Sequence, residues 1–146
     1  MLNSQMRAMG AVLIEGVKGC GKTATARQVA ASEVLLDSDP NAERRAALDP
    51  RLLLDGDTPR LLDEWQCVPR IWDTVRRTVD DRGLRGQSIL TSSATPRDDA
   101  QRHSGAGRFG VVRMRTMTLT ENRRPRRPCR SPTSSTESRP SQRTAH

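Results

Sequence analysis

Residues 15–26 read EGVKGCGKTATA, and the eight residues from 16 to 23 match the pattern G-x-x-x-x-G-K-[ST]. Glycines in such a loop let the backbone adopt positive φ and turn its N–H groups inward around an anion. The lysine is informative because the chain has only two lysines among its 25 basic residues. A lysine ammonium is a compact point charge, which the planar guanidinium of arginine does not reproduce. The stretch therefore predicts a phosphate-binding loop between a strand and a helix.

Each position of the loop has a predicted role. Lys22 would contact the outer phosphates, the hydroxyl of Thr23 would bind Mg²⁺, and the helix that opens at Lys22 would add its positive end. A glycine-rich turn with a chance lysine is the alternative. Within the loop, Lys18 is expected to be a solvated residue rather than a ligand, and Cys20 a loop filler rather than a reactive thiol. The predicted nucleotide-binding residues are Gly16, Val17, Lys18, Gly19, Cys20, Gly21, Lys22, Thr23 and Ala24.

Short apolar runs alternate with amphipathic segments through most of the chain. We expect strands at residues 11–14, 33–37, 60–64, 88–92 and 109–114, and helices at 22–31, 40–48 and 69–81. Asp39 is the expected N-cap of the second helix, and Gly83 ends the third. Apolar strands that alternate with helices are typical of a parallel sheet covered on both faces. The predicted fold is therefore α/β, a P-loop NTPase core with a parallel sheet of about five strands flanked by helices.

The charge of the chain is divided unevenly. Residues 1–121 hold 18 Lys+Arg and 16 Asp+Glu, a net charge of +2. Residues 122–146 hold seven Arg and one Glu, a net charge of +6, which completes the total of +8. The second region contains no Val, Ile, Leu, Met, Phe or Trp. It cannot bury enough apolar surface to offset its ordering entropy. We expect a nucleotide-binding core over residues 1–121 and a disordered Arg/Pro/Ser-rich tail over residues 122–146.

Several classes of protein are disfavoured by the composition. Cys20, Cys67 and Cys129 are odd in number and widely spaced, which argues against a disulfide framework or a zinc site and suits a reducing interior. No apolar run approaches the roughly 18 residues that would cross a membrane. Residues 1–10 lack the apolar region of a signal peptide. We expect a cytoplasmic protein without a membrane partner.

A pair of carboxylates follows the third predicted strand, where residues 60–64 read RLLDE. Asp63 would hold Mg²⁺, directly or through water, and Glu64 would orient and deprotonate the attacking water. The forty residues between Thr23 and Asp63 leave room for a helix, a strand and a second helix. Carboxylates also commonly end strands without any catalytic role, which is the alternative interpretation.

Two further candidates follow the fourth strand. Ser93 lies at its tip, where P-loop ATPases place a polar side chain that contacts the γ-phosphate or the attacking water; a Ser/Thr-rich turn is the alternative. Arg108 follows a run of small residues and could serve as an arginine finger, with an ordinary surface position as the alternative. Trp65 and Trp72 are expected to pack in the core rather than to stack on a nucleic-acid base.

Together these segments resemble the bacterial and archaeal AAA-type ATP-binding proteins, which carry an AAA+ core followed by a second C-terminal domain. The resemblance covers about residues 10–121, and its most specific segments are DEWQ-x-VP at 63–69 and LT-x-SATP at 90–96. It implies ATP as ligand, Asp63 and Glu64 as the Walker B pair, Ser93 as the sensor and Arg108 as the finger. The family usually has glycine where this chain has Ser92.

The resemblance stops near Glu121, where the family would continue into its lid and second domain. We hypothesise that the tail is an out-of-frame translation of a GC-rich gene, which would make the chain a truncated remnant. The abrupt change in composition motivates this hypothesis. Sequencing the locus tests it, because a shifted frame should restore an apolar continuation with helical periodicity.

The predicted function is ATP binding with Mg²⁺, with hydrolysis by in-line attack of water on the γ-phosphate as a further step. A P-loop small-molecule kinase is one alternative, because it would share the loop. The other is a non-enzymatic remnant that binds nucleotide, or binds nucleic acid weakly through the basic tail. Assembly into a homo-oligomer is left open.

Overall fold

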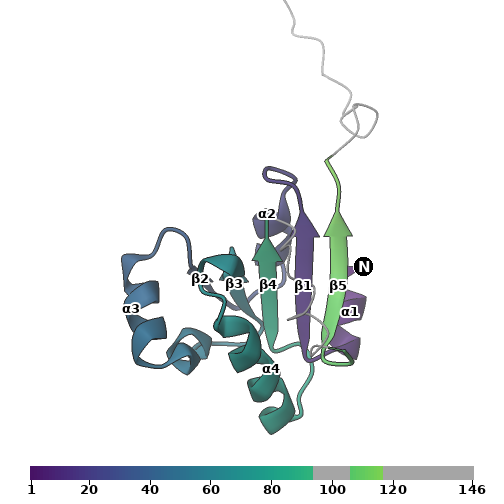
Figure 1. Cartoon of the computed structure of the whole chain (residues 1–146). Coiled ribbons are helices and arrows are strands. Elements are labelled where there is room, and N and C mark those ends of the chain that lie inside the picture. The colour runs from purple at the N-terminus through teal and green to yellow at the C-terminus, as the bar shows by residue number, and fades with distance from the viewer. Residues whose placement is uncertain (94–105, 117–146) are drawn as a thin grey trace, which may run out of the picture.

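The computed structural model describes residues 1–93 and 106–116, which form a five-stranded parallel sheet between helices (Figure 1). The strands are β1 (Ala11–Gly16), β2 (Ser32–Leu35), β3 (Arg60–Asp63), β4 (Ser88–Ser92) and β5 (Phe109–Met114). The α-helices are α1 (Leu2–Ala8), α2 (Lys22–Arg27), α3 (Pro40–Leu48) and α4 (Ile71–Arg82), and the 3₁₀ helices are η1 (Pro50–Leu54) and η2 (Trp65–Cys67). The predicted α/β class with about five parallel strands is confirmed.

The strand order β2-β3-β4-β1-β5 determines which loops meet. β1 lies between β4 and β5, so that Leu13 is opposite Leu90 on one side and Val111 on the other. Because all neighbouring strands are parallel, the carboxyl ends of β1, β3 and β4 lie at the same edge of the sheet. This edge carries the glycine-rich loop after β1 and the two carboxylates at the end of β3.

The core has two layers, one on each face of the sheet. On one face, η1, α3 and α4 pack on β1, β3 and β4, and Leu13, Leu62 and Leu90 belong to this cluster. On the other face, α1 and α2 cover a cluster that includes Val12 and Ile89. Burial of alternate strand residues on opposite faces explains why the strands read as continuous apolar runs.

Local sequence signals set the bounds of two helices. The side chain of Asp39 accepts a hydrogen bond from the backbone N–H of Asn41 at 2.9 Å, so Asp39 is the N-cap of α3 as predicted. α4 ends at Gly83, which adopts a left-handed φ of 63° and donates its N–H to the carbonyl of Val79.

Other bounds differ from the sequence prediction. α2 was expected to reach residue 31 but ends at Arg27, because the N–H groups of Gln28 and Val29 bond three residues back in a tighter turn. Ala31 then donates its N–H to the carbonyl of Pro59 at 2.8 Å, which draws the chain toward β3. Helix α1 was not predicted.

Some expectations fall on other parts of the chain. The predicted tail, and the turn after residue 93, lie outside the described residues. No helix within residues 1–93 and 106–116 combines the length and apolar character required to cross a membrane.

Candidate active site

The glycine-rich loop leaves the carboxyl end of β1 and enters α2 (Figure 1). Gly19 and Gly21 have φ angles of 82° and 88°, a left-handed conformation that L side chains rarely adopt. Gly16 is required for a different reason. A Cβ atom there would collide with the backbone carbonyl of Met114 on β5 and would lie 2.8 Å from Sγ of Cys20. The glycines therefore allow both the turn of the loop and its close approach to β5.

Lys22 is buried at the first position of α2, with 5% of its surface exposed. Its ammonium donates to the carbonyls of Gly16 at 2.7 Å and Val17 at 2.8 Å, and lies 3.9 Å from Sγ of Cys20. These partners are neutral, and Lys22 forms no salt bridge with the residues that the structure describes. A buried positive charge without a carboxylate partner is costly, so the loop favours an incoming anion.

Thr23 and Asp63 come together although forty positions separate them. The hydroxyl of Thr23 donates to Oδ1 of Asp63 at 2.7 Å, and the hydroxyl of Thr91 donates to the same oxygen at 2.6 Å. Asp63 is 7% exposed and Thr91 is fully buried. The first turn of α2, the end of β3 and the end of β4 therefore converge on one carboxylate.

Glu64 points toward the tip of β4. Its Oε2 accepts hydrogen bonds from the backbone N–H of Ser93 at 3.1 Å, from the Ser93 hydroxyl at 2.7 Å and from the side-chain amide of Gln66. Glu64 has a left-handed φ of 55°, and its own N–H donates to the hydroxyl of Thr91 at 3.0 Å. This turn ends β3 at Asp63, one residue earlier than predicted.

Opposing influences act on the pKa of Glu64. Burial raises it, but hydrogen bonds from Ser93 and Gln66 together with the positive charge of Lys22 lower it by more. The pKa of Glu64 consequently lies below its ordinary value, and its carboxylate is ionised at neutral pH.

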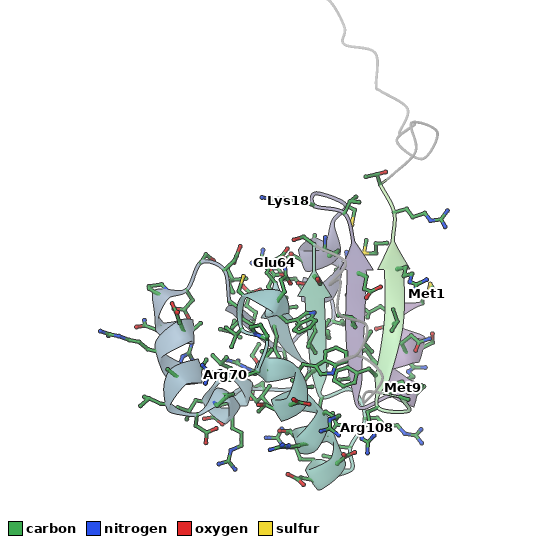
Figure 2. All side chains as sticks on the ribbon, viewed as in Figure 1. Met1, Met9, Lys18, Glu64, Arg70 and Arg108 are labelled. Carbon is green, nitrogen blue, oxygen red and sulfur yellow. The ribbon has the colours of Figure 1, made fainter. Side chains whose placement is uncertain are left out.

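The predicted site residues divide into two locations. Figure 2 shows Lys18 and Glu64 toward one end of the sheet and Arg108 toward the other. Arg108 precedes β5 and donates to Oδ1 of Asp80 on α4 at 2.5 Å, a pairing that raises the pKa of Arg108. Arg108 therefore lies away from Glu64 within one molecule (Figure 2).

The tryptophans are core residues, as predicted. Trp65 and Trp72 are 4% and 5% exposed. Their ring centroids lie 5.1 Å apart, and Trp72 stacks on Phe109 with centroids 4.1 Å apart. Cys20 is half-buried in the loop and Cys67 is exposed on η2.

Two polar residues of the site were not singled out from the sequence. Thr91 entered the sequence prediction only as one residue of the polar end of the fourth strand, and Gln66 only as one residue of the DEWQ segment. A threonine inside an apolar strand, two residues before the tip, is the signal that could have indicated Thr91. For Gln66 the only signal is its position two residues after Glu64.

The oxygens at this edge fit a magnesium site completed by phosphates. Thr23 and Asp63 offer a hydroxyl and a carboxylate in direct contact. In residues 1–93 and 106–116 no group of three or more His, Cys, Asp or Glu side chains could hold a metal without help. Mg²⁺ typically takes one or two protein oxygens and completes its shell with water and phosphate oxygens. The donor set suits a metal that arrives with a nucleotide.

Comparison with protein families agrees with this geometry. The family model described as an AAA domain matches residues 9–122, which includes the loop, all five strands and the carboxylate pair. A search of curated proteins finds no match. The family match supports nucleotide binding by this core. Since the match spans most of the chain, the protein belongs to the AAA domain family.

Proposed function

We propose that this protein binds ATP with Mg²⁺ at the loop of residues 16–23 and hydrolyses it to ADP and phosphate. The observation that carries the proposal is the buried ammonium of Lys22, which has only neutral hydrogen-bond partners and whose positive charge helps to lower the pKa of Glu64. The AAA domain match supports the nucleotide part of the proposal, and the hydrolytic part rests on the residues at the ends of β3 and β4.

Phosphate binding would draw on the backbone of the loop and on Lys22. The turn of residues 16–21 presents N–H groups, and the first turn of α2 adds more. Lys22 would exchange its bonds to the carbonyls of Gly16 and Val17 for phosphate oxygens, which carry full charge and make stronger hydrogen bonds.

Metal binding would use the Thr23–Asp63 pair. Bound magnesium would supply charge neutralisation on the β- and γ-phosphates. Thr23 would turn its hydroxyl hydrogen away from Asp63 and offer an oxygen lone pair, while Thr91 keeps its bond to Oδ1 of Asp63.

Glu64 is the proposed base. It is ionised, it follows Asp63 directly, and its carboxylate is held between two strand tips. Ser93 would act as the sensor, because its hydroxyl is already bonded to Glu64 and lies at the tip of β4. A γ-phosphate that attracted the Ser93 hydroxyl would leave Glu64 with fewer donors and make it more basic.

Arg108 is proposed to act on a neighbouring copy in a homo-oligomer. It lies toward the opposite end of the sheet from the loop, so one surface presents the nucleotide and the other the guanidinium (Figure 2). Arginine fingers supplied by a second subunit contribute large factors to phosphoryl transfer. The cytoplasmic location and weak nucleic-acid binding by the tail remain predictions.

Nucleotide titration of the purified full chain tests the binding proposal. We expect ATP to bind more tightly with Mg²⁺ than without it, and Lys22→Ala to weaken binding at least about tenfold, because it removes a charge-assisted contact. Arg44→Ala is the matched control, since it removes an exposed positive charge on α3. Equal affinities of the wild type and Lys22→Ala would contradict the site assignment.

Phosphate release without an added acceptor tests the hydrolytic proposal against a small-molecule kinase. A hydrolase releases phosphate from ATP and Mg²⁺ alone, and Glu64→Gln should slow the release about a hundredfold or more while leaving ATP binding intact. A kinase would need an acceptor, so tight binding without phosphate release would contradict hydrolysis.

A further inference from the structure

Gln66 contacts both side chains that the proposed hydrolysis requires at the strand tips. Its Nε2 donates to Oε2 of Glu64 and lies 3.4 Å from the hydroxyl oxygen of Ser93. Glu64 follows β3 and Ser93 follows β4, so a single amide group bridges the ends of two neighbouring strands. Neither side chain can move far without changing its contact with Gln66.

The chemistry of the partners fixes the orientation of this amide. Nε2 is the Gln66 atom that contacts Oε2 of Glu64, an oxygen that also accepts hydrogen bonds from the N–H and hydroxyl of Ser93, so the NH₂ group of Gln66 faces Glu64. Its carbonyl oxygen then points elsewhere. Oε1 of Gln66 is buried and has no hydrogen-bond partner among the described residues. A buried acceptor without a donor is unfavourable, and a water molecule at this position would satisfy it.

The backbone around Gln66 is held by the core. Trp65 and Val68 are 4% and 8% exposed and anchor η2 on both sides of Gln66. The N–H of Cys67 donates to the carbonyl of Glu64 at 3.0 Å and closes the turn. The amide of Gln66 is therefore presented by an ordered segment, as a group that must orient a reactant requires.

We infer that Gln66 is a positioning residue for hydrolysis: Nε2 fixes the carboxylate of Glu64 beside the hydroxyl of Ser93 at the tip of β4. The inference rests on the proposed function, because it assigns a residue to the step that Glu64 performs.

In the step itself, the water oxygen forms a bond to the γ-phosphorus. The bond between that phosphorus and the bridging oxygen breaks, and ADP leaves with the electron pair. One proton of the water passes to Glu64, and the other stays on the phosphate product. Gln66 gains and loses no proton, and its contribution is to hold the base in position.

Two substitutions separate the parts of this role. Gln66→Met keeps the length of the side chain but removes both polar atoms, and Gln66→Glu replaces the donor by a negative oxygen facing Glu64. We expect Gln66→Met to lower kcat about tenfold or more while the Kd for ATP with Mg²⁺ changes less than about twofold. Gln66→Glu should lose more, because two carboxylates would then repel each other.

A double-mutant cycle shows whether Gln66 acts through Glu64. In a Glu64→Gln background the base is already lost, so Gln66→Met should cost no further activity. Gln28→Met is the matched control, because Gln28 is exposed after α2. The inference would be contradicted if Gln66→Met lowered kcat equally in the wild-type and Glu64→Gln backgrounds. It would also be contradicted if ATP affinity fell as much as kcat.

A readout without turnover tests the contact itself. In the ¹⁵N-labelled full chain, the side-chain NH₂ signals of Gln66 should shift on Glu64→Gln, whereas those of Gln28 should not. If the wild type releases phosphate and Gln66→Met releases it at the same rate, this inference alone is contradicted. Tight ATP binding by a wild type that releases no phosphate contradicts the proposed hydrolysis and, with it, the role of Gln66.

Discussion

The hydroxyl of Thr91 donates to Oδ1 of Asp63 at 2.6 Å inside the sheet, and the same oxygen of Thr91 accepts the N–H of Glu64 at 3.0 Å. One fully buried hydroxyl thus holds the proposed metal ligand and the backbone of the proposed base. This double contact ties the carboxylate of Asp63 to the backbone of Glu64.

Thr91→Val tests this arrangement, because valine has nearly the same shape but no hydroxyl. We expect the free energy of unfolding to fall by about 1–3 kcal/mol, since the buried N–H of Glu64 loses its acceptor. Phosphate release should fall as well, since Asp63 loses a donor. Urea unfolding and a phosphate assay measure the two effects. Thr91→Ser keeps the hydroxyl and should retain most of the activity; equal losses in both variants would contradict the role of the hydroxyl.

Lys22→Arg tests why the loop uses a lysine. The ammonium is enclosed by the carbonyls of Gly16 and Val17 at 2.7 and 2.8 Å, a space that suits a compact charge. A guanidinium is larger and planar, so we expect ATP affinity to fall about as much as in Lys22→Ala. Equilibrium binding of a fluorescent ATP analogue measures this loss. Wild-type affinity in Lys22→Arg would show that only the charge matters.

Gly16→Ala should damage the loop more than Gly19→Asn. The new Cβ at Gly16 would collide with the carbonyl of Met114 and press on Cys20, so β5 or the loop must shift. Gly19 has no atom within 4 Å of an added Cβ, and asparagine tolerates its positive φ. ATP affinity and thermal unfolding compare the two variants. A larger loss in Gly19→Asn would contradict the steric explanation.

Arg108 can be tested by mixing two inactive variants. Arg108→Ala keeps its own carboxylates but lacks the finger, and Glu64→Gln lacks the base but keeps the finger. If Arg108 serves a neighbouring copy, a mixture should release phosphate faster than either variant alone. The salt bridge with Asp80 is exposed, so Arg108→Ala should leave the free energy of unfolding nearly unchanged. A mixture no faster than its components would contradict action between subunits.

The thiol of Cys67 should react slowly. Partial burial raises its pKa, and the negative charges of Asp37 and Glu64 raise it further. At neutral pH a raised pKa means a smaller thiolate fraction, so alkylation of Cys67 in a Cys20→Ser/Cys129→Ser protein should be slower than that of a free cysteine. The rate measured against pH gives the pKa. A midpoint at or below the ordinary value of a thiol would contradict this prediction.

Much of the fold could be predicted because its signals are local. Apolar runs bounded by charge or glycine mark all five strands, and Asp39 and Gly83 mark helix ends by chemistry that acts within a few residues. Helix α1 was missed because it has seven residues, no side-chain cap and only Leu2 and Met6 buried. Its stability comes from packing against β1 and β5, which periodicity over so short a segment does not reveal.

The candidate site was predictable to the extent that its chemistry follows a contiguous pattern. The loop lies within one stretch, and its contact with Asp63 follows from parallel strands whose carboxyl ends share an edge. The contact of Gln66 with Glu64 depends on the left-handed φ of Glu64, which turns the chain back on itself. No local pattern in residues 60–66 predicts this turn. The pairing of Arg108 with Asp80 likewise depends on the packing of α4 beside the start of β5.

The ring stack of Trp65, Trp72 and Phe109 gives the molecule an intrinsic optical probe. The chain has only two tryptophans, and one of them, Trp65, directly follows Glu64, the proposed base. Indole emission depends on the spacing of neighbouring rings, so rotation of the turn at Glu64 would alter the spectrum without any added label. Stopped-flow fluorescence could then time the events at the nucleotide directly.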